Sequence, residues 1–248
     1  MSSLLSNYKS ICVVAVLFAL SPAAHADSTA SAIASLGWSA ATFSGTTSPA
    51  SIPNPYSSLA EASAAGSNPY SFNGGTVTSP GWTTTTDLLP NGSNSFVLAQ
   101  SGSAITSLAS AATSDGFFQL NGQAERSGDL TTKTGLIQIT VPYTLAILMT
   151  PDTNGVGRSG TAQVWIELFD ALGQNMLGFA NSSVELPQSL SGVTGKSGTL
   201  TLTLQEAPGT YWFDLGAASE VTVVPEPGTL LLVIAGLAAV GLKFRGKI

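Results

Sequence analysis

Charged residues make up only 9% of this chain of 248 residues, whereas an ordinary soluble domain carries roughly a quarter. The chain has a single cysteine, which excludes a disulfide framework and any site built from several cysteines. Eight Lys and Arg residues stand against fourteen Asp and Glu residues, which excludes a generic nucleic-acid-binding surface. Apolar residues nevertheless reach 44%, which is too hydrophobic for an intrinsically disordered chain.

The N-terminal residues 1–26 have the order of a cleavable secretory signal peptide. Lys9 supplies positive charge, an unbroken run of ten apolar residues extends from Ile11 to Leu20, and Ala24 and Ala26 are the small residues that signal peptidase reads. Ten apolar residues are too few for a membrane-spanning helix, which needs about 20. We therefore expect a signal helix, export through Sec-type machinery, and cleavage by signal peptidase after Ala26.

Cleavage after Ala26 would remove both Cys12 and His25, the only cysteine and the only histidine. A mature chain without these residue types has no Ser-His-Asp triad and no thiol nucleophile. It also lacks the usual ligand sets for zinc, haem and iron–sulfur clusters. The sequence therefore predicts no catalytic residue, no metal and no cofactor.

The C-terminal residues 225–248 contain three elements in a fixed order. These are the motif Pro225, Glu226 and Pro227, the apolar run Gly228–Leu242, and a tail that carries Lys243, Arg245 and Lys247. As a helix, the apolar run spans about 23 Å, which is shorter than the hydrocarbon core but extended in reach by snorkelling lysines. Basic residues after the run place the tail in the cytoplasm. The two prolines keep the preceding peptide extended. A short transmembrane helix over 228–242 is therefore predicted.

This order of elements resembles the PEP-CTERM protein-sorting signal, and the resemblance covers Val224–Ile248, about a tenth of the chain. The basic tail departs from a compact arginine cluster, because Phe244 and Gly246 interrupt it. The resemblance implies cleavage near the motif by an exosortase-type membrane protease. It also implies a Gram-negative bacterium whose exported proteins accompany exopolysaccharide and biofilm matrix. On this basis the chain is anchored transiently in the inner membrane, N-terminus out and C-terminus in, and then reaches the cell surface or the exterior.

The region between the two ends, residues 27–224, shows repeated alternation of apolar and polar residues. One alternating series consists of Ile137, Ile139, Val141, Tyr143, Leu145, Ile147 and Met149, and shorter series consist of Ala162, Val164, Ile166 and Leu168, of Leu200, Leu202 and Leu204, and of Tyr211, Phe213 and Leu215. Alternation with a period of two is typical of half-buried strands. The sequence therefore predicts an all-β domain, an antiparallel β-sandwich or jelly-roll-like fold.

Residues 44–95 differ from the rest of this region, because they are rich in Ser, Thr, Gly, Pro and Asn. We interpret them as turns and short irregular strands that decorate the sandwich. The first regular strand is expected at 36–43. Further strands are expected at 96–100, 105–111 and 117–120.

The domain contains acidic residues that are candidates for glycoside chemistry, which needs only two carboxylates. The region from Asp27 to Glu226 contains all fourteen acidic residues of the chain but only four basic residues, so that its net charge is −10. By residue type, the candidates are Glu125, Asp129, Glu167 and Asp170. The alternative, which we favour, is that these carboxylates are solvated at strand ends and turns.

Two further patterns allow both a functional and a structural interpretation. Trp38, Trp82, Trp165 and Trp212 could stack on sugar rings, but packing against the second sheet of the sandwich or against the long loop is the preferred interpretation. Residues 152–155 resemble the start of a calcium loop, yet they lack its third acidic ligand and its distal Glu. A turn between two strands is therefore favoured there.

Together these features predict an exported, non-enzymatic protein of the cell surface or extracellular matrix. Its expected partners are signal peptidase, the export machinery, an exosortase and exopolysaccharide, with no nucleic acid. One alternative is a carbohydrate-binding module that uses exposed aromatic residues. A less favoured alternative is a glycoside-active enzyme that uses paired carboxylates.

Overall fold

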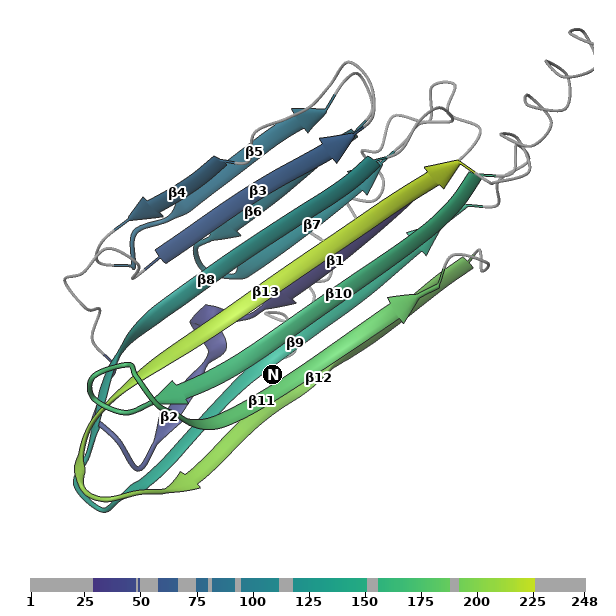
Figure 1. Cartoon of the computed structure of the whole chain (residues 1–248). Coiled ribbons are helices and arrows are strands. Elements are labelled where there is room, and N and C mark those ends of the chain that lie inside the picture. The colour runs from purple at the N-terminus through teal and green to yellow at the C-terminus, as the bar shows by residue number, and fades with distance from the viewer. Residues whose placement is uncertain are drawn as a thin grey trace, which may run out of the picture.

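The computed structural model describes residues 29–47, 49, 58–66, 75–79, 82–91, 95–111, 118–150, 156–187 and 192–225. These ranges contain thirteen strands and one short 3₁₀ turn (Figure 1). The strands are β1 (Ala30–Leu36), β2 (Thr42–Ser44), β3 (Ser58–Gly66), β4 (Gly75–Ser79), β5 (Thr85–Asn91), β6 (Ser95–Ser101), β7 (Ile105–Ala111), β8 (Phe118–Thr132), β9 (Leu136–Met149), β10 (Val156–Phe169), β11 (Met176–Leu186), β12 (Gly192–Gln205) and β13 (Gly209–Pro225), and the turn is η1 (Trp38–Ala40).

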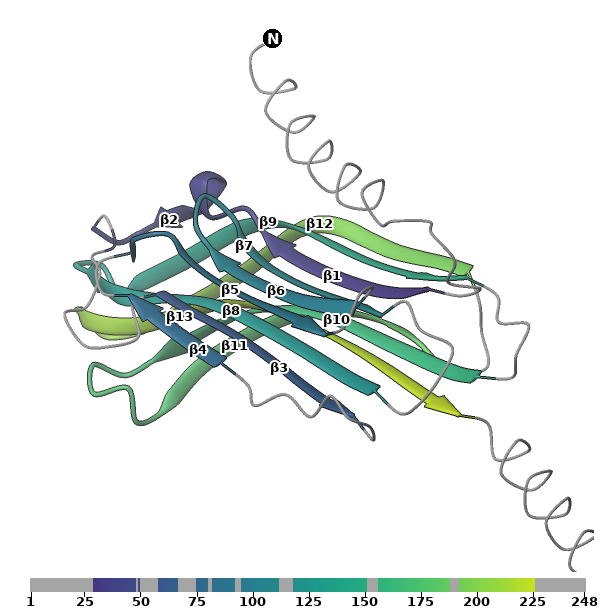
Figure 2. The ribbon, with the colours of Figure 1, turned by 90° about the horizontal axis from the view of Figure 1, so that it is seen from above.

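The strands form two antiparallel sheets that lie one over the other (Figure 2). The first sheet has the order β12-β9-β1-β7-β6-β5, and β2 also pairs with β9. The second sheet has the order β11-β10-β13-β8-β3-β4. In each sheet, the inner face is the one that turns toward the other sheet, and the outer face turns away from it. The predicted all-β antiparallel fold is confirmed, and its two packed layers are those of a sandwich.

The hydrophobic core lies between the inner faces, and the alternating series predicted its members. Every apolar residue predicted on one face of β9 is buried, as are the predicted series on β10 and β13. On β12, Leu200 and Leu202 are buried and Leu204 packs against the core. Because successive side chains of a strand point to opposite faces, each series also fixes which residues face outward.

The N-terminal part of the sandwich corrects two expectations. The first strand is not 36–43: β1 ends at Leu36, and Trp38–Ala40 form the 3₁₀ turn η1. The sequence of β1, ASAIASL, has little of the branched apolar character that marks a strand. It is a strand because it pairs along its whole length with both β7 and β9.

The segment 44–95 also contains more regular structure than predicted. Strands β3, β4 and β5 lie within it, and β3 pairs with β8 over nine consecutive positions, from Ser58 opposite Arg126 to Gly66 opposite Phe118. Pairing along a long neighbouring strand supplies the backbone hydrogen bonds that the local sequence alone would not secure. Strands were expected in this segment, but as short and irregular ones, whereas β3 is a regular strand of nine residues.

The predicted signal helix at the N-terminus and the predicted transmembrane helix over 228–242 both lie outside the described residues. Among the helices of the described ranges, none is long and apolar enough to cross a membrane.

Candidate functional site

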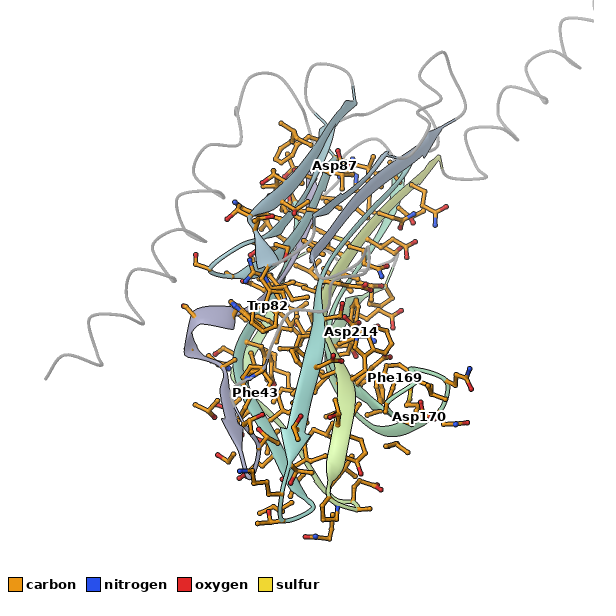
Figure 3. All side chains as sticks on the ribbon, turned by 90° about the vertical axis from the view of Figure 1, so that its left-hand side faces the viewer. Phe43, Trp82, Asp87, Phe169, Asp170 and Asp214 are labelled. Atoms are coloured by element: carbon orange, nitrogen blue, oxygen red, sulfur yellow. The ribbon has the colours of Figure 1, made fainter. Side chains whose placement is uncertain are left out.

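The outer face of the second sheet brings acidic, amide and aromatic side chains together on its three central strands, β10, β13 and β8. Glu167 on β10 lies opposite Asp214 on β13. On the neighbouring rung, Trp165 on β10 lies opposite Gly216, which in turn lies opposite Glu125 on β8. In Figure 3, Asp214 lies on the other side of the second sheet from Phe43 and Trp82, whose rings pack toward the core.

The centre of this face is a contact between Trp165, Gly216 and Asp214. The indole Nε1 of Trp165 donates a hydrogen bond to Oδ2 of Asp214 at 3.2 Å. The indole ring lies directly over Gly216, since a Cβ atom at that position would lie 2.0 Å from the ring. Asp214 is only 6% exposed and Trp165 only 9%. A glycine at 216 is therefore what lets the ring reach across β13 and cover the carboxyl group.

The structure brings together two of the four predicted carboxylates and separates the other two. Glu125 and Glu167 lie near Asp214, and these three residues form the acidic cluster of this face. Asp214 itself was not among the residues predicted from the sequence. Asp129 lies one rung further along, opposite Trp212, and Asp170 lies in the turn after β10. The alternation of Tyr211, Phe213 and Leu215 could have indicated Asp214, because it places an acidic residue on the outer face in the middle of a long strand.

Burial and neighbouring charge control the protonation of this acidic cluster. Burial raises the pKa of Asp214 well above its usual range, and the negative charges of Glu125 and Glu167 raise it further. Burial also raises the pKa of Glu167 and the pKa of Asp129. A carboxyl group in this position therefore holds its proton more tightly than in the unfolded chain.

The substitution Asp214→Asn is expected to make the fold more stable at pH 8 than the wild type. An acid whose folded pKa is raised contributes stability below its unfolded pKa, and this stability is lost as the pH rises toward the folded pKa. Asparagine has no charge to bury, and its carbonyl oxygen still accepts the hydrogen bond from Trp165. We expect a gain of about 1–3 kcal/mol, measured by urea unfolding at about pH 4, 6 and 8.

The control for this measurement is Asp170→Asn. Hydrogen bonds from the backbone of Gln174 and the side chain of Asn175 lower the pKa of Asp170, so its pH dependence has the opposite sign. The free energy of unfolding at pH 8 should not rise in that variant. Parallel pH curves for Asp214→Asn and the wild type would show that Asp214 does not carry the effect.

Next to the acidic cluster, residues of the same three strands line an open groove with a volume of about 350 Å³. Its lining includes Asn121, Gln123, Thr161, Gln163, Ala218 and Glu220. The rung Gln163–Ala218–Gln123 explains the shape, because a small residue on the central strand lies between two long amides. This volume is close to the lower limit of the range found for pockets that bind small molecules.

Two hydrogen-bond networks order the polar side chains around this groove. Oε1 of Glu220 accepts hydrogen bonds from Nε2 of Gln119 at 2.9 Å and from Oγ1 of Thr222 at 3.2 Å. Nε2 of Gln123 donates to Oε1 of Glu125. The groove and the acidic cluster are thus linked through Gln123 and Glu125 and form one continuous polar surface.

Asp170 has a structural position in the turn between β10 and β11. Its Oδ1 accepts hydrogen bonds from the backbone N–H groups of Leu172 at 3.1 Å and Gln174 at 2.8 Å, and its Oδ2 accepts one from Asn175. A carboxylate that caps a turn in this way is a common use of Asp. The position fits the favoured interpretation of Asp170 as a turn residue.

The four tryptophans are engaged in packing. Trp38 and Trp82 are 5.0 Å apart between ring centroids and contact Phe213 in the core. Trp212 packs against Phe169 at 4.8 Å, and Trp165 covers Gly216 as described. Trp38 and Trp82 therefore pack against the second sheet, as expected, through Phe213. Trp165 and Trp212 instead pack on the outer face of the sheet to which they belong.

Several predicted functional residues lie outside the described residues. These are Ala24, Ala26, Glu226, Pro227, Lys243, Arg245, Lys247 and the calcium-like segment 152–155. Pro225 is described: it is the last residue of β13 and lies opposite Val156 on β10. Within the described ranges, no group of three or more His, Cys, Asp or Glu side chains has an arrangement that could hold a metal ion.

Comparison with known families identifies the C-terminal segment. Residues 223–247 match the PEP-CTERM protein-sorting motif. No curated protein matches the chain. The motif implies export, processing by an exosortase and transient anchoring in a membrane through the C-terminal region. The sequence resemblance in this segment is thereby confirmed.

Proposed function

We propose that this chain is a non-enzymatic protein of the cell surface or extracellular matrix, associated with exopolysaccharide or biofilm in a Gram-negative bacterium. Signal peptidase cleaves it after Ala26, and an exosortase cleaves it near Pro225–Pro227. Before the second cleavage its N-terminus faces outward and its C-terminus faces the cytoplasm. The observation that carries the proposal is the sorting motif at 223–247.

The position of the motif in the fold supports this order of events. The matched segment begins at Val223, which pairs with Phe118 on one side and Arg158 on the other. Strand β13 is thus paired on both sides up to Val223 and with β10 alone up to Pro225, and no linker separates the strand from the motif. A cut before Pro225 would remove residues from this strand, so processing that preserves the sheet falls at or after Pro225.

The strand ends also support attachment to a membrane from one side. Ala30 at the start of β1 lies opposite Met149 at the end of β9. Pro225 lies opposite Val156 at the start of β10, the next strand in the chain after β9. The described chain therefore enters and leaves the sandwich at the same end. A folded domain can then remain joined to both terminal segments while they are in the membrane.

The proposed lack of catalysis is supported by the residues available. From Asp27 onward the sequence contains no His and no Cys. Of the three clustered carboxyl groups, that of Asp214 is buried beneath Trp165. A substrate could not reach a carboxyl group in this position. Glycoside hydrolysis needs two carboxyl groups that flank an accessible bond, and this arrangement does not favour that alternative.

The intact mass of the protein recovered from cells and from the medium tests the proposal directly. We expect a mass that corresponds to a chain from Asp27 to near Pro227, in the medium or at the cell surface. A mass that retains residues 228–248 would make the tail a permanent anchor and would contradict release. A mass that retains residues 1–26 would contradict cleavage after Ala26.

A further inference from the structure

We propose that the groove on the outer face of the second sheet binds an uncharged polysaccharide through its sugar hydroxyl groups. The inference rests on the proposed function, because a matrix protein encounters such polymers, and it adds a site and a chemical class of ligand. The groove is the cavity of about 350 Å³ lined by Asn121, Gly122, Gln123, Thr161, Gln163, Ala218, Ser219 and Glu220.

The lining fits a ligand that both donates and accepts hydrogen bonds at many points. Three of the eight lining residues are amides, and each amide side chain has two donor hydrogens and an acceptor oxygen. Thr161 adds a hydroxyl group, which can act in either direction. Sugar hydroxyls are donors and acceptors at once, so pairs of them match this lining. No Lys or Arg is among the lining residues.

The charge of the surroundings disfavours an anionic ligand. Glu220 lies in the groove, and Glu125, next to it, is hydrogen-bonded to Gln123. Glu167 lies on the same face, two rungs along β10 from Gln163. The chain between Asp27 and Glu226 carries a net charge of −10, which adds long-range repulsion. An uncharged sugar polymer avoids this repulsion, whereas a uronic acid polymer does not.

The position of the groove favours a sugar over a peptide. Extended peptides bind at a sheet edge or in apolar pockets. This groove instead crosses β10, β13 and β8, which are central strands with a paired neighbour on each side. Its floor at Ala218 is small, and the indole of Trp165 covers the next rung at Gly216. A rigid, preorganised polar face of this kind lowers the entropic cost of holding a ligand.

Binding of the full chain, purified in detergent, to an immobilised oligosaccharide array tests the proposal. The array carries neutral oligosaccharides of glucose, galactose, mannose and N-acetylhexosamines, together with uronic acid and glucosamine oligosaccharides. We expect binding to at least one neutral class. The double variant Gln123→Ala/Gln163→Ala should lose at least tenfold in affinity. Ala218→Phe, which fills the groove, should do the same without removing an amide.

The matched control is Gln100→Ala, which removes an exposed amide from β6 in the first sheet and should bind as the wild type does. Thermal melting of each variant establishes that it is folded before its affinity is compared. Binding to no neutral oligosaccharide, or only to charged ones, would overturn the proposal. Undiminished affinity in both folded groove variants would also overturn it. The array tests sugar binding by the groove, whereas the intact mass tests the proposed export and processing. A negative result in one experiment therefore does not decide the other.

Discussion

Replacing both prolines of the sorting motif, as Pro225→Ala/Pro227→Ala, is expected to leave most of the chain unprocessed and retained in the membrane. The two prolines fix the backbone of this segment as extended and remove two amide donors. Alanine at both positions lets the following apolar run propagate a helix backward through Glu226. An extended peptide at the membrane boundary, which a protease can bind, would then be lost. Intact mass of the membrane and medium fractions measures the outcome.

A matched control for this experiment is Pro187→Ala, at an exposed proline that follows β11 in the described chain. That variant should be processed and released as the wild type is. Pro225 is the last residue of β13 and has no strand residue after it, so its replacement should leave the sandwich folded. Normal release of the double variant into the medium would contradict a role for the two prolines.

The alternating series predicted the parts of the fold in which the sequence itself carries the pattern. The series of β9 from Ile137 to Met149 predicted a strand, its inner face and its burial, because one apolar face on a strand can be satisfied only by a second layer. The sorting motif was predicted for a similar reason. Its three elements are contiguous, so no knowledge of the fold is needed to recognise them.

Features that depend on neighbouring strands could not be predicted in this way. Strand β1 is made mostly of Ala and Ser, and its pairing with β7 and β9 along its whole length determines that it is a strand. Residues 44–95 were expected to form turns and short irregular strands, and the regular pairing of β3 with β8 has the same origin. Local sequence signals are weak for such segments, and the pairing that stabilises them joins residues far apart in the chain.

The candidate site shows the same limit at the level of single residues. Glu125 and Glu167 were candidates by residue type alone, whereas their common neighbour Asp214 was not. The contact that buries Asp214 needs Trp165 from another strand and the absence of a side chain at Gly216. The groove likewise forms because Gln163, Ala218 and Gln123 share a rung. Strand register creates these sites, and the register was not predictable from composition or alternation.

The substitution Gly216→Ala is expected to cost about 2–4 kcal/mol of stability, although alanine is usually better than glycine in a strand. The new methyl group would lie 2.0 Å from the Trp165 ring, so the ring must move off the sheet. That movement breaks the hydrogen bond from Nε1 to Asp214 and adds overpacking strain. For a domain of this size we expect a fall in Tm of roughly 5–15 °C, with a shift in tryptophan emission toward a more solvated environment.

A second glycine on the same strand provides the control, and a double-mutant cycle isolates the cause. A methyl group on Gly209 would meet its nearest atoms at 3.8 Å, which is an ordinary contact, so Gly209→Ala should stay within about 0.5 kcal/mol of the wild type. In a Trp165→Ala background, Gly216→Ala should cost far less than in the wild type, because the clashing ring is gone. An equal cost in both backgrounds would mean that glycine is required at position 216 for a reason other than the indole that covers Asp214.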